Sequence, residues 1–258
     1  MGWWSHVDTL LGRLKVTLCV VLMWACITLV ASLPPSISYN VSPLYANHLV
    51  AKGKILSMAD VYSSVAKTKP CHCRTACWMD SRCVAVAEVS DNEGPMYCHL
   101  SDKGPTSSTV LDDALSTYIF WQDSLPSGNY SMWEDNMLYL IVPKWMNFTS
   151  AKALCAQIPG HRLAITKSVV QYNALDKMAL QTGFEMWVDL TKASEMSPVV
   201  WGDGEEFAKT GAATVEEYLQ NGLEFPVAFR TYTDILDDKS LSHKAYPLCQ
   251  ANPMGLDW

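Results

Sequence analysis

The sequence predicts an α+β protein in which two small, disulfide-stabilised units follow an N-terminal export segment. Three observations support this. Runs with helical spacing alternate with short strand-like runs through most of the chain. The nine cysteines are unevenly spread: five lie in 71–98, and only Cys155 and Cys249 follow. Between these groups, residues 121–131 (WQDSLPSGNYS) are rich in Ser, Gly, Pro and Asn, a composition typical of a linker.

Residues 1–32 have the pattern of a secretory signal peptide. Arg13 and Lys15 precede an apolar run at 16–31, and small residues stand at its end. The run is shorter than the ~20 residues that span a bilayer. We therefore expect a secreted, extracellular protein whose mature chain starts near Leu33.

An uncleaved signal anchor is the alternative, because length alone does not exclude it. The protein would then be a type II membrane protein with its C-terminal domains outside. Sequons at Asn40, Asn129 and Asn147 agree with export, since a glycan is added only in the secretory pathway. Pro43 makes Asn40 the weakest of the three.

Composition excludes several classes of function. A hydrophobic content of 49% and ten tryptophans suit packed domains and not disorder. A net charge of −7 without any Lys/Arg run argues against a nucleic-acid-binding protein. The chain has no G-x-S-x-G, H-E-x-x-H or phosphate-binding glycine loop, so we predict no enzyme activity and no catalytic residues. His161 and His243 are expected to be surface residues.

The first unit is predicted to span residues 55–124, after an N-terminal segment at 33–54. Pro70 suits the first turn of a helix that places Cys73 and Cys77 on one face. Three strands are expected to follow, at 83–89 (CVAVAEV), 96–100 (MYCHL) and 116–122 (STYIFWQ).

The stretch 70–83 (PCHCRTACWMDSRC) could hold zinc, with His72 among its ligands, or form disulfides. Export favours disulfides, because the secretory pathway is oxidising. No second Cys/His pair at zinc-site spacing follows, which also argues against zinc.

The segment resembles a PAN/apple domain. The matching residues are Cys73-x3-Cys77-x5-Cys83, the run YCHLSD around Cys98, and an aromatic strand near Tyr118. The resemblance implies the disulfides Cys73–Cys98 and Cys77–Cys83, and a domain that binds proteins or carbohydrates without catalysis. The family's outermost disulfide has no complete counterpart here. A generic disulfide-stabilised fold with no binding role is the alternative.

Cys71 is then left without a partner. On a helix it lies roughly 200° from Cys73, so it faces solvent or a neighbouring chain. Two outcomes are open: an interchain disulfide that gives a covalent homodimer, or a buried or capped free thiol.

The second unit is predicted at 137–252, between a linker at 125–136 and a tail at 253–258. One helix is expected at 147–158, capped by Thr149 or Ser150. Another is expected at 168–183, where Ser168 and Gln171 form a capping box and Gly183 ends the helix. Strands are expected at 161–165, 186–190, 198–204 and 245–250.

This order of elements resembles a C-type lectin-like domain. The residues that carry the resemblance are AKALC ending at Cys155, GHRLAI, MWVDL, WGDG, and YPLCQ with Cys249. The resemblance implies two helices with mixed β-sheets, the disulfide Cys155–Cys249, and carbohydrate recognition. The family's inner cysteine pair is absent, and Pro226 or Val227 and Leu241 fill its places.

The calcium-binding triplets of sugar-binding family members are also absent. These are Glu-Pro-Asn or Gln-Pro-Asp, followed by Trp-Asn-Asp. The oxygen-bearing side chains left in the corresponding regions are Glu217, Asn221, Asp237 and Asp238, which are the candidate ligand-binding residues. Calcium takes six to eight oxygens, so we predict neither a metal nor another cofactor. A solvated acidic loop is the alternative.

The sequence therefore predicts a secreted, non-catalytic recognition protein whose partner is a glycan or an extracellular protein surface. Carbohydrate binding without the usual calcium site is what the resemblance implies. A calcium-independent protein-binding or extracellular structural module is the alternative.

Overall fold

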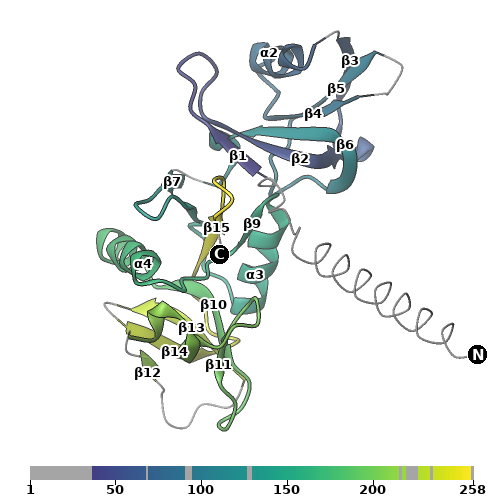
Figure 1. Cartoon of the computed structure of the whole chain (residues 1–258). Coiled ribbons are helices and arrows are strands. Elements are labelled where there is room, and N and C mark those ends of the chain that lie inside the picture. The colour runs from purple at the N-terminus through teal and green to yellow at the C-terminus, as the bar shows by residue number, and fades with distance from the viewer. Residues whose placement is uncertain are drawn as a thin grey trace, which may run out of the picture. The chain divides into compact units, whose positions relative to one another are not determined.

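The computed structural model describes residues 37–67, 69–90, 95–126, 130–214, 217–218, 226–232 and 235–256. Every described element belongs to one compact unit within residues 35–258. The predicted signal peptide, Asn129 and Asn221 lie outside the described residues. The described part is an α+β fold with three α-helices and two sheets (Figure 1).

The first sheet is antiparallel, with strand order β1-β2-β6-β4-β5-β3. Its strands are β1 (Ile37–Asn40), β2 (His48–Leu56), β3 (Ser63–Lys67), β4 (Ala85–Val89), β5 (Met96–Ser101) and β6 (Val110–Trp121). Short 3-10 turns occur at η1 (Met58–Asp60) and η2 (Gln122–Ser124).

Helix α2 (Cys71–Met79) packs on β4 and β5 through its cysteine face. Pro70 precedes the helix with φ −54°, the backbone angle that proline favours. Cys73 and Cys77 are fully buried and form the disulfides Cys73–Cys98 and Cys77–Cys83, the pairs that the PAN/apple resemblance implies. Cys71 is exposed and free.

The first sheet begins earlier than the sequence predicts. Residue 55, the expected start of the first unit, lies inside β2, which pairs with β6 from His48–Trp121 to Leu56–Val110. The segment at 33–54 therefore contributes two strands. Tyr130, in the predicted linker, is likewise buried and begins strand β7.

The second sheet has the order β12-β14-β13-β10-β15-β8-β7, with β11 on β10 and β9 on β15. It is mixed, because β10–β15 and β12–β14 pair in parallel. The strands are β7 (Tyr130–Met132), β8 (Leu138–Ile141), β9 (His161–Leu163), β10 (Met186–Lys192), β11 (Val199–Trp201), β12 (Glu217–Tyr218), β13 (Val227–Tyr232), β14 (Ile235–Ser240) and β15 (Tyr246–Ala251). The helices are α3 (Phe148–Gln157) and α4 (Val169–Thr182), with turns η3 (Phe207–Lys209) and η4 (Gly211–Thr214).

The ends of α4 are as predicted. Ser168 and Gln171 form the capping box, and Gly183 ends the helix in the left-handed region at φ 67°. The predicted cap of α3 is wrong: Asn147 is the N-cap, and its side-chain oxygen accepts the Ser150 N–H at 2.9 Å. Asparagine caps a helix at least as well as threonine or serine.

The disulfide Cys155–Cys249 joins α3 to β15 across 94 residues of sequence. Where the family's inner cystine would stand, a strand pair closes the structure instead. Val227 pairs with Ser240 at the open end of the β13–β14 hairpin, and Leu241, next in the chain, packs against the core.

Gly202, in the WGDG turn after β11, lies directly against Asp189. The Gly202 N–H donates to the Asp189 carbonyl at 2.7 Å, and a Cβ on Gly202 would overlap the Asp189 carboxylate. That carboxylate accepts the Lys152 ammonium at 2.8 Å, so the close approach links β10 to α3. Burial raises the pKa of Asp189, and Lys152 opposes the shift.

One apolar core contains side chains from both sheets. Leu49, Ala87 and Phe120 of the first sheet belong to the same buried cluster as Leu140 and Trp187 of the second. A second cluster lies between α4 and the second sheet, and a third lies under α2. The boundary predicted near residue 125 therefore does not separate two independent cores.

Candidate functional site

The β13–β14 hairpin carries the two aspartates that the sequence singles out. Asp237 and Asp238 are neighbours on β14, so their side chains point to opposite faces of the sheet. Both residues are buried, at 5% and 1% exposure. A solvated acidic loop, the alternative drawn from the sequence, does not describe these two residues.

Asp237 is held by two basic side chains. Its Oδ2 accepts from Arg230 Nη2 at 3.0 Å and lies 2.8 Å from Lys239 Nζ. Arg230 faces Asp237 directly across the hairpin and also pairs with Glu185. The charge of Asp237 is thus balanced within the protein.

Calcium does not fit the described part of this hairpin. The other oxygen of Asp237, Oδ1, is buried with no hydrogen-bond partner in the residues described. A calcium ion there would meet one free oxygen beside two cations, whereas calcium takes six to eight oxygens. Within the described ranges, no group of three His, Cys, Asp or Glu residues is placed to hold a metal.

The side chains of only two of the four candidate ligand residues, Asp237 and Asp238, lie within the described structure. The backbone of Glu217 lies in β12, which pairs with β14, but its side chain is outside the description. Asn221 lies outside the described residues altogether. A ligand site made of Glu217, Asn221, Asp237 and Asp238 stays a prediction.

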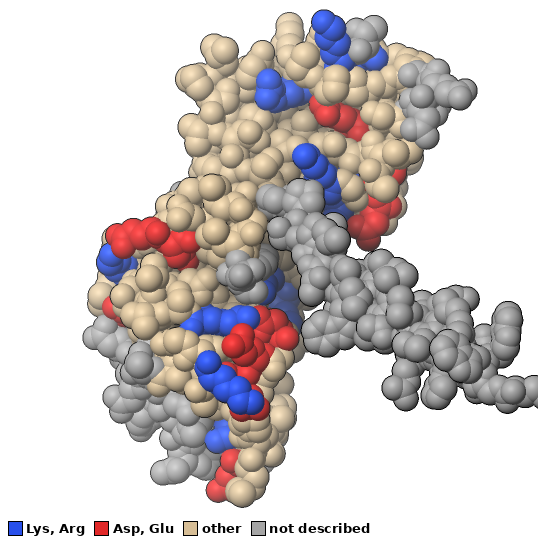
Figure 2. All heavy atoms as spheres, viewed as in Figure 1, with Lys and Arg blue, Asp and Glu red and all other residues tan. Residues whose placement is uncertain are grey.

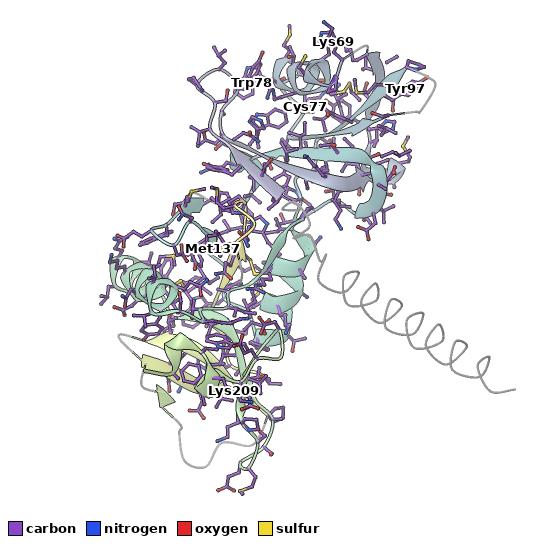
Figure 3. The ribbon with its side chains drawn as sticks, viewed as in Figure 1. Lys69, Cys77, Trp78, Tyr97, Met137 and Lys209 are labelled. Carbon is purple, nitrogen blue, oxygen red and sulfur yellow. A yellow bond between two sulfur atoms is a disulfide. The ribbon has the colours of Figure 1, made fainter. Side chains whose placement is uncertain are left out.

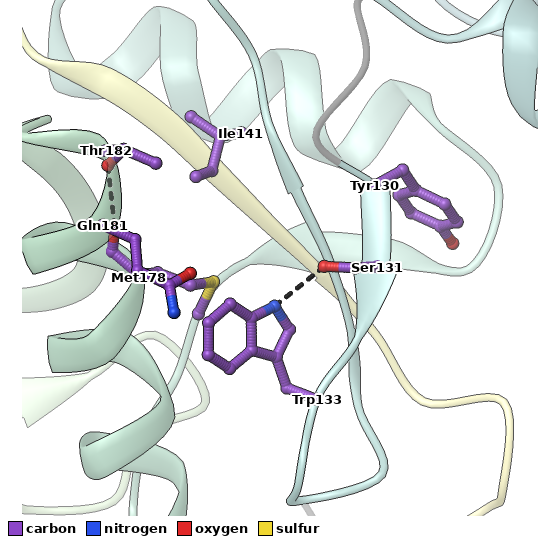
Figure 4. A pocket seen from close by; sticks show the side chains of 7 residues that line it. All are labelled: Tyr130, Ser131, Trp133, Ile141, Met178, Gln181 and Thr182. Carbon is purple, nitrogen blue, oxygen red and sulfur yellow. Dashed lines mark hydrogen bonds between the residues drawn. The ribbon is translucent and has the colours of Figure 1, made fainter.

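A pocket that the sequence analysis missed lies between α4 and the β7–β8 hairpin. Its volume is about 210 Å³. Figure 4 shows the Trp133 indole facing Met178 and Gln181 of α4, while the Tyr130 ring points away. The lining residues are Tyr130, Ser131, Trp133, Ile141, Met178, Gln181 and Thr182.

The turn between β7 and β8 holds Trp133 in place. The Trp133 N–H donates to the Met137 carbonyl at 3.0 Å, and its indole Nε1 donates to Ser131 Oγ at 2.9 Å. The Asp135 carboxylate accepts from Tyr139 Oη at 2.6 Å. Burial raises the pKa of Asp135, and the hydrogen bonds from Tyr139 Oη and the Met137 N–H oppose the shift.

Some polar groups of this pocket are already hydrogen-bonded within the protein, and one is not. Thr182 Oγ1 donates to the Met178 carbonyl at 2.7 Å, and Ser131 Oγ accepts from Trp133. The Gln181 amide is exposed and makes no hydrogen bond to another described residue. The pocket thus offers an apolar ring face beside an available amide, with no charged side chain among its lining residues.

His161 is not a surface residue, contrary to the sequence prediction. It is 7% exposed, with Nε2 3.1 Å from Tyr130 Oη and Nδ1 3.0 Å from the Pro159 carbonyl. Burial lowers the pKa of His161 to about 4. His243 is partly buried, and its Nε2 lies 3.4 Å from Arg230 Nη1.

The charged surface on the face drawn in Figure 2 is mixed. Lys and Arg side chains lie beside Asp and Glu there and form no extended basic area. Among the described residues, no helix is long and apolar enough to cross a membrane.

No protein-family model matches the sequence, and a search of the curated proteins finds no match. Among solved structures, the chain is similar to TC14, a C-type lectin from the tunicate Polyandrocarpa misakiensis. The two are 16% identical, with a TM-score of 0.38, over 47% of this chain and 99% of that chain.

Two further solved structures are similar over the same share of the chain. A Ca²⁺-dependent type II antifreeze protein in its Ca²⁺-free form is 16% identical, with a TM-score of 0.38, over 48% of this chain and 98% of its own. CEL-IV is 13% identical, with a TM-score of 0.38, over 49% and 94%. Each of these three structures covers about half of this chain.

Proposed function

We propose that this chain is a non-catalytic recognition protein that binds a neutral carbohydrate in the Trp133 pocket without calcium. The observation that carries the proposal is the pairing of the Trp133 indole face with the available Gln181 amide. A sugar ring presents a face of C–H groups that can pack on an indole, and an amide can both donate to and accept from its hydroxyls.

The size and charge of the pocket support a small neutral ligand. Its volume of about 210 Å³ is below the roughly 300–1,000 Å³ of sites for drug-sized molecules, so it admits about one ring. A charged ligand would lose water without gaining an opposite charge among the lining residues, which costs free energy. Independence from calcium is supported by the Asp237 ion pairs in the β13–β14 hairpin.

A glycan array probed with the full chain, in calcium and in EDTA, tests this proposal. Gln181→Ala changes an exposed helix residue and should weaken binding about fivefold, the effect of losing one hydrogen bond of ~1 kcal/mol. Trp133→Ala should abolish binding, and Trp145→Ala, an exposed tryptophan outside the pocket, should not change it. Loss of binding in EDTA, or unchanged binding by Gln181→Ala, would refute the proposal.

Calcium-independent protein binding is a second candidate, favoured by a row of aromatic rings. Trp145 is 54% exposed and meets Tyr246 edge to face at 5.6 Å between centroids. Phe184 stacks on the same Tyr246 ring, with 4.2 Å between centroids. Exposed aromatic side chains are enriched in protein interfaces. If this candidate is right, Trp145→Ala and not Trp133→Ala should abolish binding.

We further infer that the chain is exported, that its first sheet belongs to a PAN/apple-like module, and that Asn147 is glycosylated. A glycan on Asn147 Nδ2 would leave Oδ1 free to cap α3 as it does here.

Terminal sequencing and glycosidase treatment of secreted protein should show a start near Leu33 and sugar at Asn147 and Asn129. Intact Met1 in a membrane fraction would favour the anchor instead. Non-reducing electrophoresis of wild type and Cys71→Ser distinguishes the two outcomes left open for Cys71: a covalent dimer that the variant lacks, or a monomer in both proteins.

A further inference from the structure

A second pocket lies on the first sheet, where the end of α2 meets the end of β6. Its volume is about 220 Å³, and its walls include two tryptophans, Trp78 and Trp121, and two aspartates, Asp80 and Asp123. Ser81 and Ser124 add hydroxyl groups. No residue of the Trp133 pocket takes part, so this site is independent of the carbohydrate proposal.

Of the two tryptophan rings in this pocket, one is buried and hydrogen-bonded and the other is exposed. Trp121 is 6% exposed, and its Nε1 donates to the Tyr45 carbonyl at 2.6 Å. Trp78 stacks on Trp121 with 6.3 Å between ring centroids and 27° between planes. Trp78 is 46% exposed and lies at α2 beside the β1–β2 connection (Figure 3), where Tyr45 meets it edge to face.

The two carboxylates differ in their partners. Asp80 accepts from Tyr62 Oη at 2.9 Å and from the Arg82 backbone N–H at 3.0 Å, and the Arg82 guanidinium lies 3.3 Å away. These hydrogen bonds hold the pKa of Asp80 below its ordinary value. Asp123 is exposed and makes no ion pair or hydrogen bond to a described residue through its side chain.

We propose that this pocket binds a basic side chain, Lys or Arg, of a partner protein. A cation over the face of a tryptophan is attracted by the ring's quadrupole, and Trp is the best aromatic partner for it. The methylene stem of Lys or Arg would pack along the Trp78 ring while its charged end reaches the Asp123 carboxylate. Arg82 balances the charge of Asp80 but not that of Asp123. The negative charge of Asp123 therefore favours a cationic ligand.

A neutral sugar fits this pocket less well than a cation. Covering Asp123 with a neutral ring would remove water from a carboxylate without supplying a positive charge, and that desolvation is costly. The surroundings also suit a protein partner, because Met79, next to Trp78, is 80% exposed and offers apolar contact area. A single pocket of this size holds one side chain, as expected for an anchor residue in an interface.

The test uses the full chain labelled with ¹⁵N, in which each tryptophan gives a separate indole N–H signal. Nα-acetyl-lysine amide is titrated in, with Nα-acetyl-norleucine amide as the matched probe that lacks the ammonium group. The lysine probe should shift the Trp78 and Trp121 signals, and added salt should reduce the effect because the interaction is electrostatic. The norleucine probe should leave both signals unchanged.

Asp123→Asn keeps the shape of the side chain and removes its charge. It should weaken lysine-probe binding about fivefold, as expected for a partly exposed charge pair. Glu195→Gln is the matched control: it changes the net charge equally at an exposed residue outside the pocket, and should leave binding unaltered.

Three outcomes would overturn the proposal. Equal shifts from the lysine and norleucine probes would mean that the pocket recognises an apolar chain. Shifts at Trp78 and Trp121 from methyl glucoside, and not from the lysine probe, would make it a sugar site. Unchanged Trp78 and Trp121 signals with every probe would mean that the pocket binds none of these ligands.

Discussion

At the scale of single residues, His161 shows how a side chain that looks unremarkable in sequence takes on a defined role. Its Nδ1 faces the Pro159 carbonyl, which can only accept a hydrogen bond, so we assign the proton to Nδ1. Nε2 is then the acceptor for the Tyr130 hydroxyl. A second proton on the ring would occupy the nitrogen that accepts from Tyr130 and would carry charge into a buried site.

The contribution of His161 to the stability of the protein should therefore fall as the pH falls from about 6.5 to about 4. The pKa of His161 is lowered from its ordinary 6.5 to about 4 by burial. Between these values the unfolded chain binds a proton that the folded chain does not, so acid favours unfolding. A difference of this size corresponds to at most about 3 kcal/mol, fully lost below pH 4.

Urea unfolding of wild type and His161→Gln across pH 4–7 checks this expectation. Other histidines, among them His48 and His243, also have pKa values lowered by burial. The stability of both proteins therefore keeps some dependence on pH from these residues. The difference between the two proteins isolates His161, because glutamine does not titrate. Parallel curves for the two proteins would show that His161 is not held neutral by its site.

At the scale of elements, the sequence predicts the helices from local signals. It does not predict strands that pair with partners distant in the chain. The capping box and terminal glycine of α4 lie within its own sequence, and both are found in the structure. Strand β2 was missed because Lys52 and Lys54 interrupt its apolar pattern and its partner β6 lies some 60 residues away in the chain. Nothing near 48–56 in the sequence indicates that partner.

The candidate ligand hairpin shows the same limit. In the sequence, Asp237 and Asp238 stand out as an acidic pair, and Arg230 stands seven residues earlier. The register of β13 on β14 then sets Arg230 opposite Asp237. Opposite charges in a cross-strand pair stabilise a hairpin, so a carboxylate that looks like a ligand in sequence becomes part of the fold.

The Trp133 pocket was missed for a related reason. Trp133 falls in the segment 125–136, whose composition reads as a linker, and its partner Gln181 is on α4. The sequence alone does not indicate that Trp133 lines a pocket, because its position depends on the conformation of the β7–β8 turn. Asn136 adopts φ 61° in that turn, a left-handed conformation that asparagine tolerates better than most residues.

At the scale of the whole molecule, the residues from 37 to 256 should unfold as one unit, because one apolar core contains both sheets. Within it, Ile37 of β1 lies close to Gly160, in the turn before β9. Ile37 is 1% exposed, and an ideal Cβ on Gly160 would lie 2.7 Å from Ile37 Cβ. A real side chain at residue 160 would force Ile37 to move.

Gly160→Ala should therefore destabilise the protein more than Gly183→Ala does. Both glycines have positive φ, 73° and 67°, so each substitution costs about 1–2 kcal/mol in backbone strain. A Cβ on Gly183 meets nothing within 4 Å, which makes this variant the control for strain alone. The extra cost at Gly160, on the order of 1–3 kcal/mol for overpacking, measures the clash with Ile37.

A double-mutant cycle decides whether this cost arises at the contact between β1 and the turn before β9. Ile37→Gly removes all three atoms that the new Cβ would meet, Cβ, Cγ2 and Cδ1, so Gly160→Ala should cost at least 1 kcal/mol less in that background, by urea unfolding. Hydrogen exchange of peptides from the first sheet and from α4 should report the same change in unfolding free energy for Gly160→Ala, since a shared core couples them. If the two costs simply add and only the peptides around β9 lose protection, the first sheet and the second half fold as separate domains, as the linker-like composition of 121–131 suggests.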